Sequence, residues 1–565
     1  MPLSPLHSDD GRRRAVRSRP PTETRSMTTA VEAATPDAGA RLPRQIPYII
    51  GNEACERFSF YGMRNILVQF LVSSVILSYL PEAERQGMAK EVFHSFVIGV
   101  YFFPLLGGWL SDRFFGKYHT IFWLSLLYCV GHACLAMFEG NRTGFYTGLF
   151  LIALGSGGIK PLVSSFVGDQ FNQSNKHLAK IVYDAFYWTI NFGSFFASLL
   201  MPIFLREHGA AIAFGIPGIL MFIATIIFWM GRAKYVNMPP APSDPNSFLS
   251  VVKTALRGGN SGQKGTGSAI ATAGVAIAIG LLLGWVLSPT WWPKDFGFVI
   301  SFCLALGAIL LFGGIGTALQ LERARGAHPD AAIDGARAVL RILIVFAIVS
   351  PFWSLFDQKA STWVLQGKSM IMPDDLWWWP SWLVKEAGQM QALNPLLVML
   401  LIPFNNLVLY PMLTKLGFKV TALRRMGWGV AFSGLAWVFA GMIQLWIDGG
   451  DPVSLAWQIA PYTLLTFAEV LVSATGLEFA YSQSPPSMKG VIMSFWFLSV
   501  TFGNVWVLLT NAAVRNETAM AQIASTGLSE NAFLMFFFAG FAFVAALIFA
   551  WYARRYPLQD YYRAA

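Results

Sequence analysis

The chain has 565 residues, of which 55% are hydrophobic and 13% charged, and its mean hydropathy is +0.50. An ordinary soluble domain carries about 25% charged residues, so this composition excludes that class. The net charge of +10 is concentrated in the N-terminal tail and in short loops, which favours a positive-inside membrane topology over nucleic-acid binding. Many apolar runs reach the roughly 20 residues of a membrane-spanning helix, whereas a β-barrel would show alternating segments of about ten residues. We therefore expect an all-α polytopic membrane protein.

The chain divides into two long apolar regions with an insertion between them. Residues 1–45 are polar and Arg-rich, which predicts a disordered cytoplasmic tail without a cleavable signal peptide. A first six-helix bundle is expected over 46–231, with spans at 46–79, 91–111, 118–138, 143–168, 181–204 and 210–231. Residues 232–338 are expected to form two polar linkers, 232–268 and 322–338, around an inserted helix pair at 269–290 and 296–321.

A second six-helix bundle is expected over 339–553, before a cytoplasmic tail at 554–565. Its spans are predicted at 339–365, 390–414, 421–447, 454–482, 490–514 and 531–553. Lys and Arg residues gather in loops on one side of this arrangement, at 113–117, 232–234, 415–425 and 554–555, whereas Glu82, Glu84 and Trp377–Trp379 lie on the other. With fourteen crossings, the positive-inside rule places both termini in the cytoplasm. Six spans, a helix pair and six spans predict a two-halved 6+6 transporter.

The sequence shows no sign of a metal site or of enzyme chemistry. The four cysteines lie in apolar runs without metal-ligand spacing, which favours small buried hydrophobic residues: Cys55, Cys129, Cys134 and Cys303. The glycine-rich run Gly155–Lys160 lacks the spacing of a phosphate-binding loop. No HExxH or Gly-x-Ser-x-Gly motif is present, so we expect neither an enzyme nor a cofactor.

The first span carries four charges on one face. At 100° per residue, Glu53, Glu56, Arg57 and Arg64 fall within an arc of about 100°. An unpaired charge inside a bilayer costs several kcal/mol, so these residues should pair with one another or line a water-filled path. The alternative interpretation is that these residues form permanent salt bridges between packed helices. Such packing needs only one ion pair, whereas this face carries four charges.

Three polar residues stand out in the later spans of the first half. His94 is either a satisfied hydrogen-bonding residue or a proton carrier. Lys160 lies well inside its span, where its ammonium can meet a carboxylate or extend to the membrane surface. Asn191 can orient a substrate or join neighbouring helices by hydrogen bonds.

The second half carries acids at different depths. Asp357 matches Arg64 in depth, so the two predict either a gating salt bridge or a permanent one. Glu469, near mid-membrane, would bind a cation or a proton, whereas Glu478 lies nearer the cytoplasmic end on the opposite helix face. Together the spans hold five acids and four bases, which suits a zwitterionic substrate or internal ion pairs better than a channel for one sign of ion. The bases are Arg57, Arg64, Lys160 and Lys359.

The run Glu53, Glu56, Arg57, Phe58, Tyr61 and Gly62 resembles the E-x-x-E-R-F-x-Y-Y-G motif of the proton-dependent oligopeptide transporter (POT/PTR) family, within the major facilitator superfamily. Phe60 stands where that motif has its first Tyr. Residues 157–171, 186–193, 352–358 and 469–483 resemble further signatures of the family, and 107–117 resembles a loop motif of the superfamily. The resemblance covers about residues 46–553. The inserted pair and the short loop between the ninth and tenth main helices are similar to the bacterial members.

The resemblance implies a proton-coupled symporter with the major facilitator fold, which imports di- and tripeptides through a bacterial inner membrane. We expect the protein to be a monomer. The resemblance also implies roles for individual residues. Those expected to bind the peptide carboxylate are Arg57, Tyr61 and Lys160, and those expected to bind its amino group are Glu469, Asn191 and Asn394. Tyr101 would contact the ligand and Trp353 would line the side-chain pockets. Proton coupling would use Glu53, Glu56 and His94, and the outer gate would pair Asp357 with Arg64 or Lys160.

A related proton-coupled symporter for nitrate or another small non-peptide solute is the alternative. Glu469 argues against it, because a site for a plain anion has no need of that acid. A membrane-embedded enzyme or receptor is a second alternative, against which the missing catalytic motifs and the missing soluble domain both argue.

Overall fold

The computed structural model describes residues 42–557 except 173, 174, 176, 177, 241–243, 260, 261, 264, 291, 294 and 484–487. Most of the predicted N-terminal tail, residues 1–41, and residues 558–565 of the predicted C-terminal tail therefore lie outside the described residues. The described chain is helical almost throughout, and its only β-type pairings are two isolated bridges.

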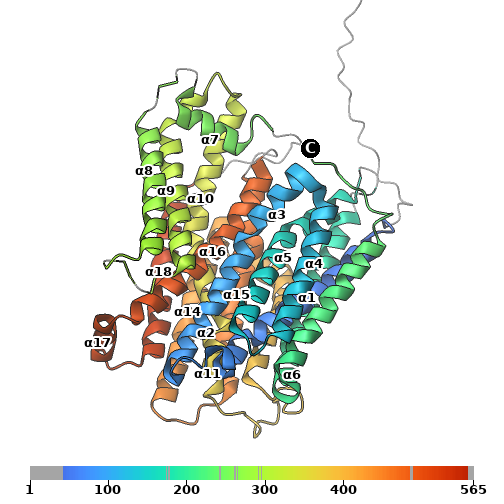
Figure 1. The fold of residues 1–565 in the computed structure, drawn as a ribbon, viewed down its shortest axis with the longest axis vertical. Coiled ribbons are helices and arrows are strands. Elements are labelled where there is room, and N and C mark those ends of the chain that lie inside the picture. The colour runs from blue at the N-terminus through green and yellow to red at the C-terminus, as the bar shows by residue number, and fades with distance from the viewer. Residues whose placement is uncertain are drawn as a thin grey trace, which may run out of the picture.

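The first half of the chain folds as one bundle of long helices (Figure 1). Its helices are α1 (Ile46–Ser73), α2 (Glu82–Phe102), α3 (Pro104–Leu110), α4 (Gly116–Met137), α5 (Arg142–Asp169) and α6 (Ala179–Met230). The 52 residues of α6 contain one break at Gly209, whose φ of 80° and ψ of 175° are not helical. Because a glycine adopts positive φ at little cost, the chain reverses there and crosses twice, between the predicted spans 181–204 and 210–231.

The second half follows after three helices of the insertion. The insertion holds α7 (Phe248–Arg257), α8 (Thr266–Leu287) and α9 (Phe298–Gln320). The second half consists of α10 (Asp330–Asp357), α11 (Thr362–Lys368), α12 (Leu393–Phe404), α13 (Tyr410–Lys415), α14 (Ala422–Asp448), α15 (Ile459–Ser482), α16 (Lys489–Val514), α17 (Glu517–Ser525) and α18 (Glu530–Ala553).

Eleven stretches of the described chain are long and apolar enough to cross a membrane. Two of them, Glu82–Met137 with 56 residues and Ile181–Met230 with 50 residues, are long enough for two crossings each. The helix α1 is not among the eleven, because its charged face lowers its hydropathy. With α1 added and the two long stretches divided, the described residues contain the fourteen predicted crossings.

Several elements differ from the prediction, among them the first span, whose α-helix ends at Ser73 rather than at 79. The helix α2 begins at Glu82 rather than at 91, and α10 begins at Asp330 rather than at 339. Residues 248–257, which the sequence assigns to a polar linker, form the helix α7, with Phe248, Val251 and Ala255 buried on one side. In α2 and α10 polar residues extend the helix ahead of the apolar run, so hydropathy alone places the start too late, and in α7 it misses a helix with only one apolar side.

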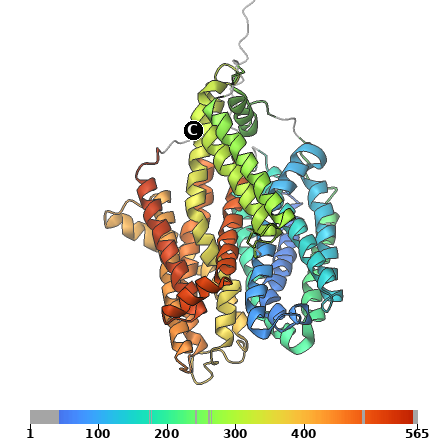
Figure 2. The same ribbon diagram turned by 60° about the vertical axis from the view of Figure 1, so that its left-hand side comes forward.

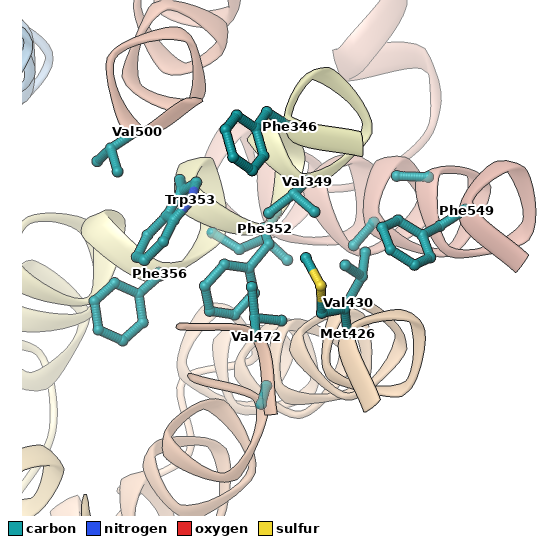
Figure 3. Close-up of a cluster of buried hydrophobic side chains, with 14 of the residues drawn as sticks. Phe346, Val349, Phe352, Trp353, Phe356, Met426, Val430, Val472, Val500 and Phe549 are labelled. Carbon is teal, nitrogen blue, oxygen red and sulfur yellow. The ribbon is translucent and has the colours of Figure 1, made fainter. Parts of the chain in front are cut away.

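The halves have separate hydrophobic cores. Apart from Ala360 and Leu365, one core is built from residues 46–235, and the other from residues 248–556. Figure 3 shows part of the second, where Val349 and Phe352 of α10 face Met426 and Val430 of α14. Phe346 and Trp353 of the same helix pack instead on Trp496 of α16. The boundaries predicted for the domains stay a prediction, but this division gives each half its own rigid packing.

The inserted pair lies against the line along which the halves meet (Figure 2). Ile300 and Cys303 of α9 pack in one cluster with Ile98 of α2, from the first half, and with Val505 of α16, from the second. We call the end of the molecule where α3 and α7 lie the basic end, and the end where α11 and α17 lie the outer end (Figure 1).

Candidate functional site

Three charges of α1 form a buried cluster. The Arg57 Nε lies 2.9 Å from Glu53 Oε1 and 2.5 Å from Glu56 Oε2, and the three residues are 7%, 3% and 1% exposed. The Nε and both Glu56 oxygens lack hydrogen-bond geometry within the described structure. Arg57 thus lies in close ion-pair contact with two carboxylates of its own helix, although its Nε is not aligned for a hydrogen bond.

A glycine of α6 lies against the turn of α1 that carries this cluster. A Cβ on Gly193 would lie 3.2 Å from the Ala54 carbonyl oxygen and 3.4 Å from the Arg57 Cβ. The lack of a side chain thus lets α6 approach α1 at the charged turn. This contact gives a physical reason for the glycine in the run Asn191–Phe–Gly193.

Lys160 reaches the same region from α5. Its Nζ lies over the ring of Phe60, 3.8 Å from the centroid, and 4.8 Å from the centroid of Tyr101. Among the described residues no carboxylate lies within ion-pair distance of this ammonium. The structure therefore places Lys160 against aromatic faces, and the predicted pairing of Lys160 with Asp357 is absent from this conformation.

The partner of Asp357 is Arg64. The Arg64 Nη2 donates to Asp357 Oδ1 at 2.6 Å, and both residues are buried, at 6% and 2% exposure. The guanidinium also lies 5.2 Å from the ring centroid of Phe93. This ion pair joins α1 of the first half to α10 of the second. Its role as a gate stays a prediction.

The ion pair continues into a hydrogen-bonded chain that reaches His94. Asn504 of α16 donates through Nδ2 to Asp357 Oδ2 at 2.8 Å, and its Oδ1 lies 2.6 Å from His94 Nδ1. Because an amide oxygen only accepts, the His94 Nδ1 donates here. The His94 Nε2 lies 3.0 Å from the Ser361 Oγ. His94 is thus fully buried and bonded at both ring nitrogens, and it is linked to the predicted gate through one side chain.

Sequence reasoning missed Asn504 and Ser361. Asn504 interrupts the apolar run of its span, after Gly503, and that interruption was the available signal. Ser361 carried no signal, because hydroxyl residues commonly bond to their own helix backbone.

Glu469 of α15 has a different environment. Asn394 of α12 donates to Glu469 Oε2 at 2.6 Å and also to Thr466 Oγ1 at 3.1 Å. Lys359 places its Nζ 3.3 Å from the Phe356 ring centroid rather than in an ion pair with Glu469. Asn191 donates to the Tyr187 carbonyl oxygen of its own helix at 3.0 Å. Of the three predicted amine-binding residues, the structure therefore brings two together, and Asn191 is bonded elsewhere.

The remaining predicted binding residues are aromatic. Tyr61 contacts Phe60 edge to face at 5.3 Å, and the Tyr101 ring stacks on Phe497 of the other half at 6.2 Å. Trp353 is 7% exposed and packs against the ring of Trp496. Figure 3 shows Trp353 beside Phe356 and Val500, inside the core of the second half. The predicted role of Trp353 in lining the side-chain pockets stays a prediction.

Contacts between the halves concentrate toward the outer end. Besides the Arg64–Asp357 pair, Arg206 of α6 lies 2.7 Å from Glu386, and Gln391 donates to the Asn65 carbonyl oxygen at 3.0 Å. Toward the basic end, no ion pair of the described residues joins the two halves: Lys117–Asp169 and Arg425–Glu478 each stay within one half, and the pairs of Arg325 and Arg337 lie within the insertion and α10. The structure is therefore closed at the outer end.

The fold and this site define a two-halved helical membrane transporter of the major facilitator type. A family model described as "POT family" matches residues 118–273 and 317–525. A solved structure of an auto-inhibited POT family peptide transporter is 63% identical with a TM-score of 0.87, covering 93% of this chain and 99% of that one. The POT family transporter PepTSo is 61% identical with the same TM-score, covering 93% of this chain and all of its own. The chain belongs to the POT family.

Curated relatives match over a smaller share of their length. Peptide transporter family 2 of Caenorhabditis elegans is 31% identical over 433 residues, which are 72% of this chain and 48% of that protein. Solute carrier family 15 member 2 of Mus musculus is 31% identical over 430 residues, 73% of this chain and 50% of that protein. The chain thus spans about half the length of these curated relatives.

Proposed function

We propose that this protein is a proton-coupled symporter that imports di- and tripeptides by alternating access. We place it as a monomer in a bacterial inner membrane, with both termini in the cytoplasm, and assign it no cofactor, metal or enzymatic activity. Its family membership and the naming of its relatives as peptide transporters support the substrate class. Among the relatives described above, two are named as peptide transporters and none is named as a nitrate transporter.

The observation that carries the proposal is the separation of charge between the halves. Arg57 and Lys160 belong to the first half, and Glu469 belongs to the second. A short peptide is a dipole with a carboxylate at one end and an ammonium at the other. Opposed poles can therefore hold its two termini while its side chains stay outside the charge contacts, which accounts for tolerance of many sequences.

Proton coupling is assigned to Glu53 and Glu56. While both are ionised, they attract Arg57 at 2.9 and 2.5 Å and compete with any substrate carboxylate. A proton on either acid weakens that attraction and releases the guanidinium toward the peptide. A membrane potential of 100 mV contributes about 2.3 kcal/mol for each charge that crosses, which drives accumulation.

The test is uptake by the full-length protein in liposomes. We expect labelled dialanine to accumulate when an inward proton gradient is imposed, and unlabelled dipeptides but not nitrate to compete with it. Glu56→Gln should abolish uphill uptake while retaining dialanine counterflow, because exchange needs no net proton movement. Glu82→Gln, an exposed acid at the start of α2, is the matched control and should transport normally. Uphill uptake by Glu56→Gln would contradict the coupling role, and inhibition by nitrate would support the alternative.

A further inference from the structure

Lys160 differs from the two arginines of α1 in what balances its charge. Arg57 and Arg64 each have a carboxylate within 3 Å. Lys160 has none within ion-pair distance among the described residues, and its ammonium lies between the rings of Phe60 and Tyr101. A lysine inside a membrane protein normally pairs with an acid or with backbone carbonyls. The two rings therefore replace an expected counter-charge.

The nearer ring is fixed in place. Phe60 is 2% exposed, meets Tyr61 edge to face at 5.3 Å and stacks on Phe96 at 6.4 Å. It is one helical turn from Arg57, whose guanidinium carbon lies 6.0 Å from the same ring centroid. Phe60 therefore presents a rigid face to Lys160 beside the acid cluster of α1.

An aromatic face and a carboxylate hold a cation in different ways. A ring attracts the ammonium through its quadrupole, and it leaves the positive charge unneutralised. A carboxylate neutralises the charge, so a substrate must first displace it. Glu56 and Glu53 precede Phe60 by about one and two turns on the same face of α1. Without the ring, these carboxylates are the nearby groups with which the Lys160 ammonium can pair.

We propose that Phe60 is a positioning residue, which holds the Lys160 ammonium unpaired and ready to receive the carboxylate of a peptide. This inference rests on the proposed function and adds to it the state in which Lys160 waits for substrate. It also gives a reason for the ring at this position, where the motif of the family has Tyr. The ring face is the essential feature, and the hydroxyl is dispensable.

The experiment compares Phe60→Leu with Phe60→Tyr in dialanine counterflow by the full-length protein. Lys160 is partly exposed, and loss of a cation–π contact between the exposed and the desolvated limits changes an equilibrium by roughly tenfold. Phe60→Leu should therefore raise the half-maximal dialanine concentration about tenfold, with the maximal exchange rate kept. Phe60→Tyr retains the ring and should stay within about twofold of the wild type.

The matched control is Phe70→Leu, on the same helix and 7% exposed, whose ring packs on Phe145 and Phe214, away from Lys160. It should leave the half-maximal concentration unchanged. If Phe60→Leu does not elute as a monodisperse protein, Phe60→Met takes its place with the same expectation. An unchanged half-maximal concentration in the folded variant, or an equal rise in Phe60→Tyr or Phe70→Leu, would overturn the inference. Absence of dialanine exchange by the wild type would overturn the proposed function, and this inference with it.

Discussion

The Arg64–Asp357 ion pair offers the sharpest test of outer-end closure. Asp357→Asn keeps the size of the side chain but leaves Arg64 as a buried cation without its carboxylate, which now lies 2.6 Å away. Removing one partner of a buried pair costs about 3–5 kcal/mol. The cost falls on the closed conformation, because water reaches Arg64 once the halves separate. At 1.4 kcal/mol for each factor of ten, the lower figure corresponds to about two orders of magnitude in the equilibrium.

The distance between the halves at the outer end reports this equilibrium. Glu84 at the start of α2 and Asp451 after α14 are exposed residues at that end, one in each half. Both can carry spin labels on introduced cysteines once the four native cysteines are replaced by serine. In pulsed electron paramagnetic resonance we expect one short distance for the parent protein. Asp357→Asn should add a population at longer distance.

Arg206 supplies the matched control. It also joins the halves at the outer end, through Glu386 at 2.7 Å, but its side chain is 41% exposed. Exposed ion pairs contribute about 0–1 kcal/mol, so Arg206→Gln should leave the distance distribution unchanged. An unshifted distribution in Asp357→Asn, or an equal shift in Arg206→Gln, would refute the assignment of closure to the buried pair.

Two further changes test helix packing and the polar network. Gly107→Ala would place a Cβ 2.1 Å from the Gly158 carbonyl oxygen, so it should lower the Tm of the purified protein. The control Gly108→Ala meets nothing within 4 Å and should leave the Tm unchanged. Equal Tm values for the two variants would show that α3 and α5 separate freely. Asn504→Leu removes the amide that bonds to both His94 and Asp357, which leaves these two buried groups without that partner at a cost of about 1–3 kcal/mol each. We therefore expect a lower Tm and, in the spin-label assay, a larger population with the outer end open. Wild-type values for both would show that water replaces the amide.

The spans were predictable wherever hydropathy alone decides them. The inserted helices α8 and α9 occupy Thr266–Leu287 and Phe298–Gln320, within three residues of the predicted 269–290 and 296–321. Helix starts in polar sequence were not predictable in this way. The helices α2 and α10 begin directly after Pro81 and Pro329, several residues before the apolar run. A proline followed by acidic residues in the first turn marks a helix start, because negative charge is favourable near the helix N-terminus, and this signal is independent of hydropathy.

The site was predictable within a helix and much less so between helices. A period of 3.6 residues places Glu53, Glu56 and Arg57 on one face, and the structure brings them together. The choice between Arg64 and Lys160 as partner of Asp357 depends on how the two halves are placed, about which local sequence says nothing. Asn191 shows the same limit, since its amide bonds to its own helix.

The distribution of charge between the halves bears on the substrate that the proposed mechanism can use. Arg57 and Lys160 move with the first half, and Glu469 moves with the second. A peptide held at both termini therefore links the halves at mid-depth, so its binding energy acts on their relative position. An ion such as nitrate contacts only the cationic pole and leaves Glu469 without a partner ion. Only a substrate that differs in affinity between two conformations shifts their equilibrium. A zwitterion of the right length meets this condition through its contacts with both halves, whereas a plain anion contacts one half only.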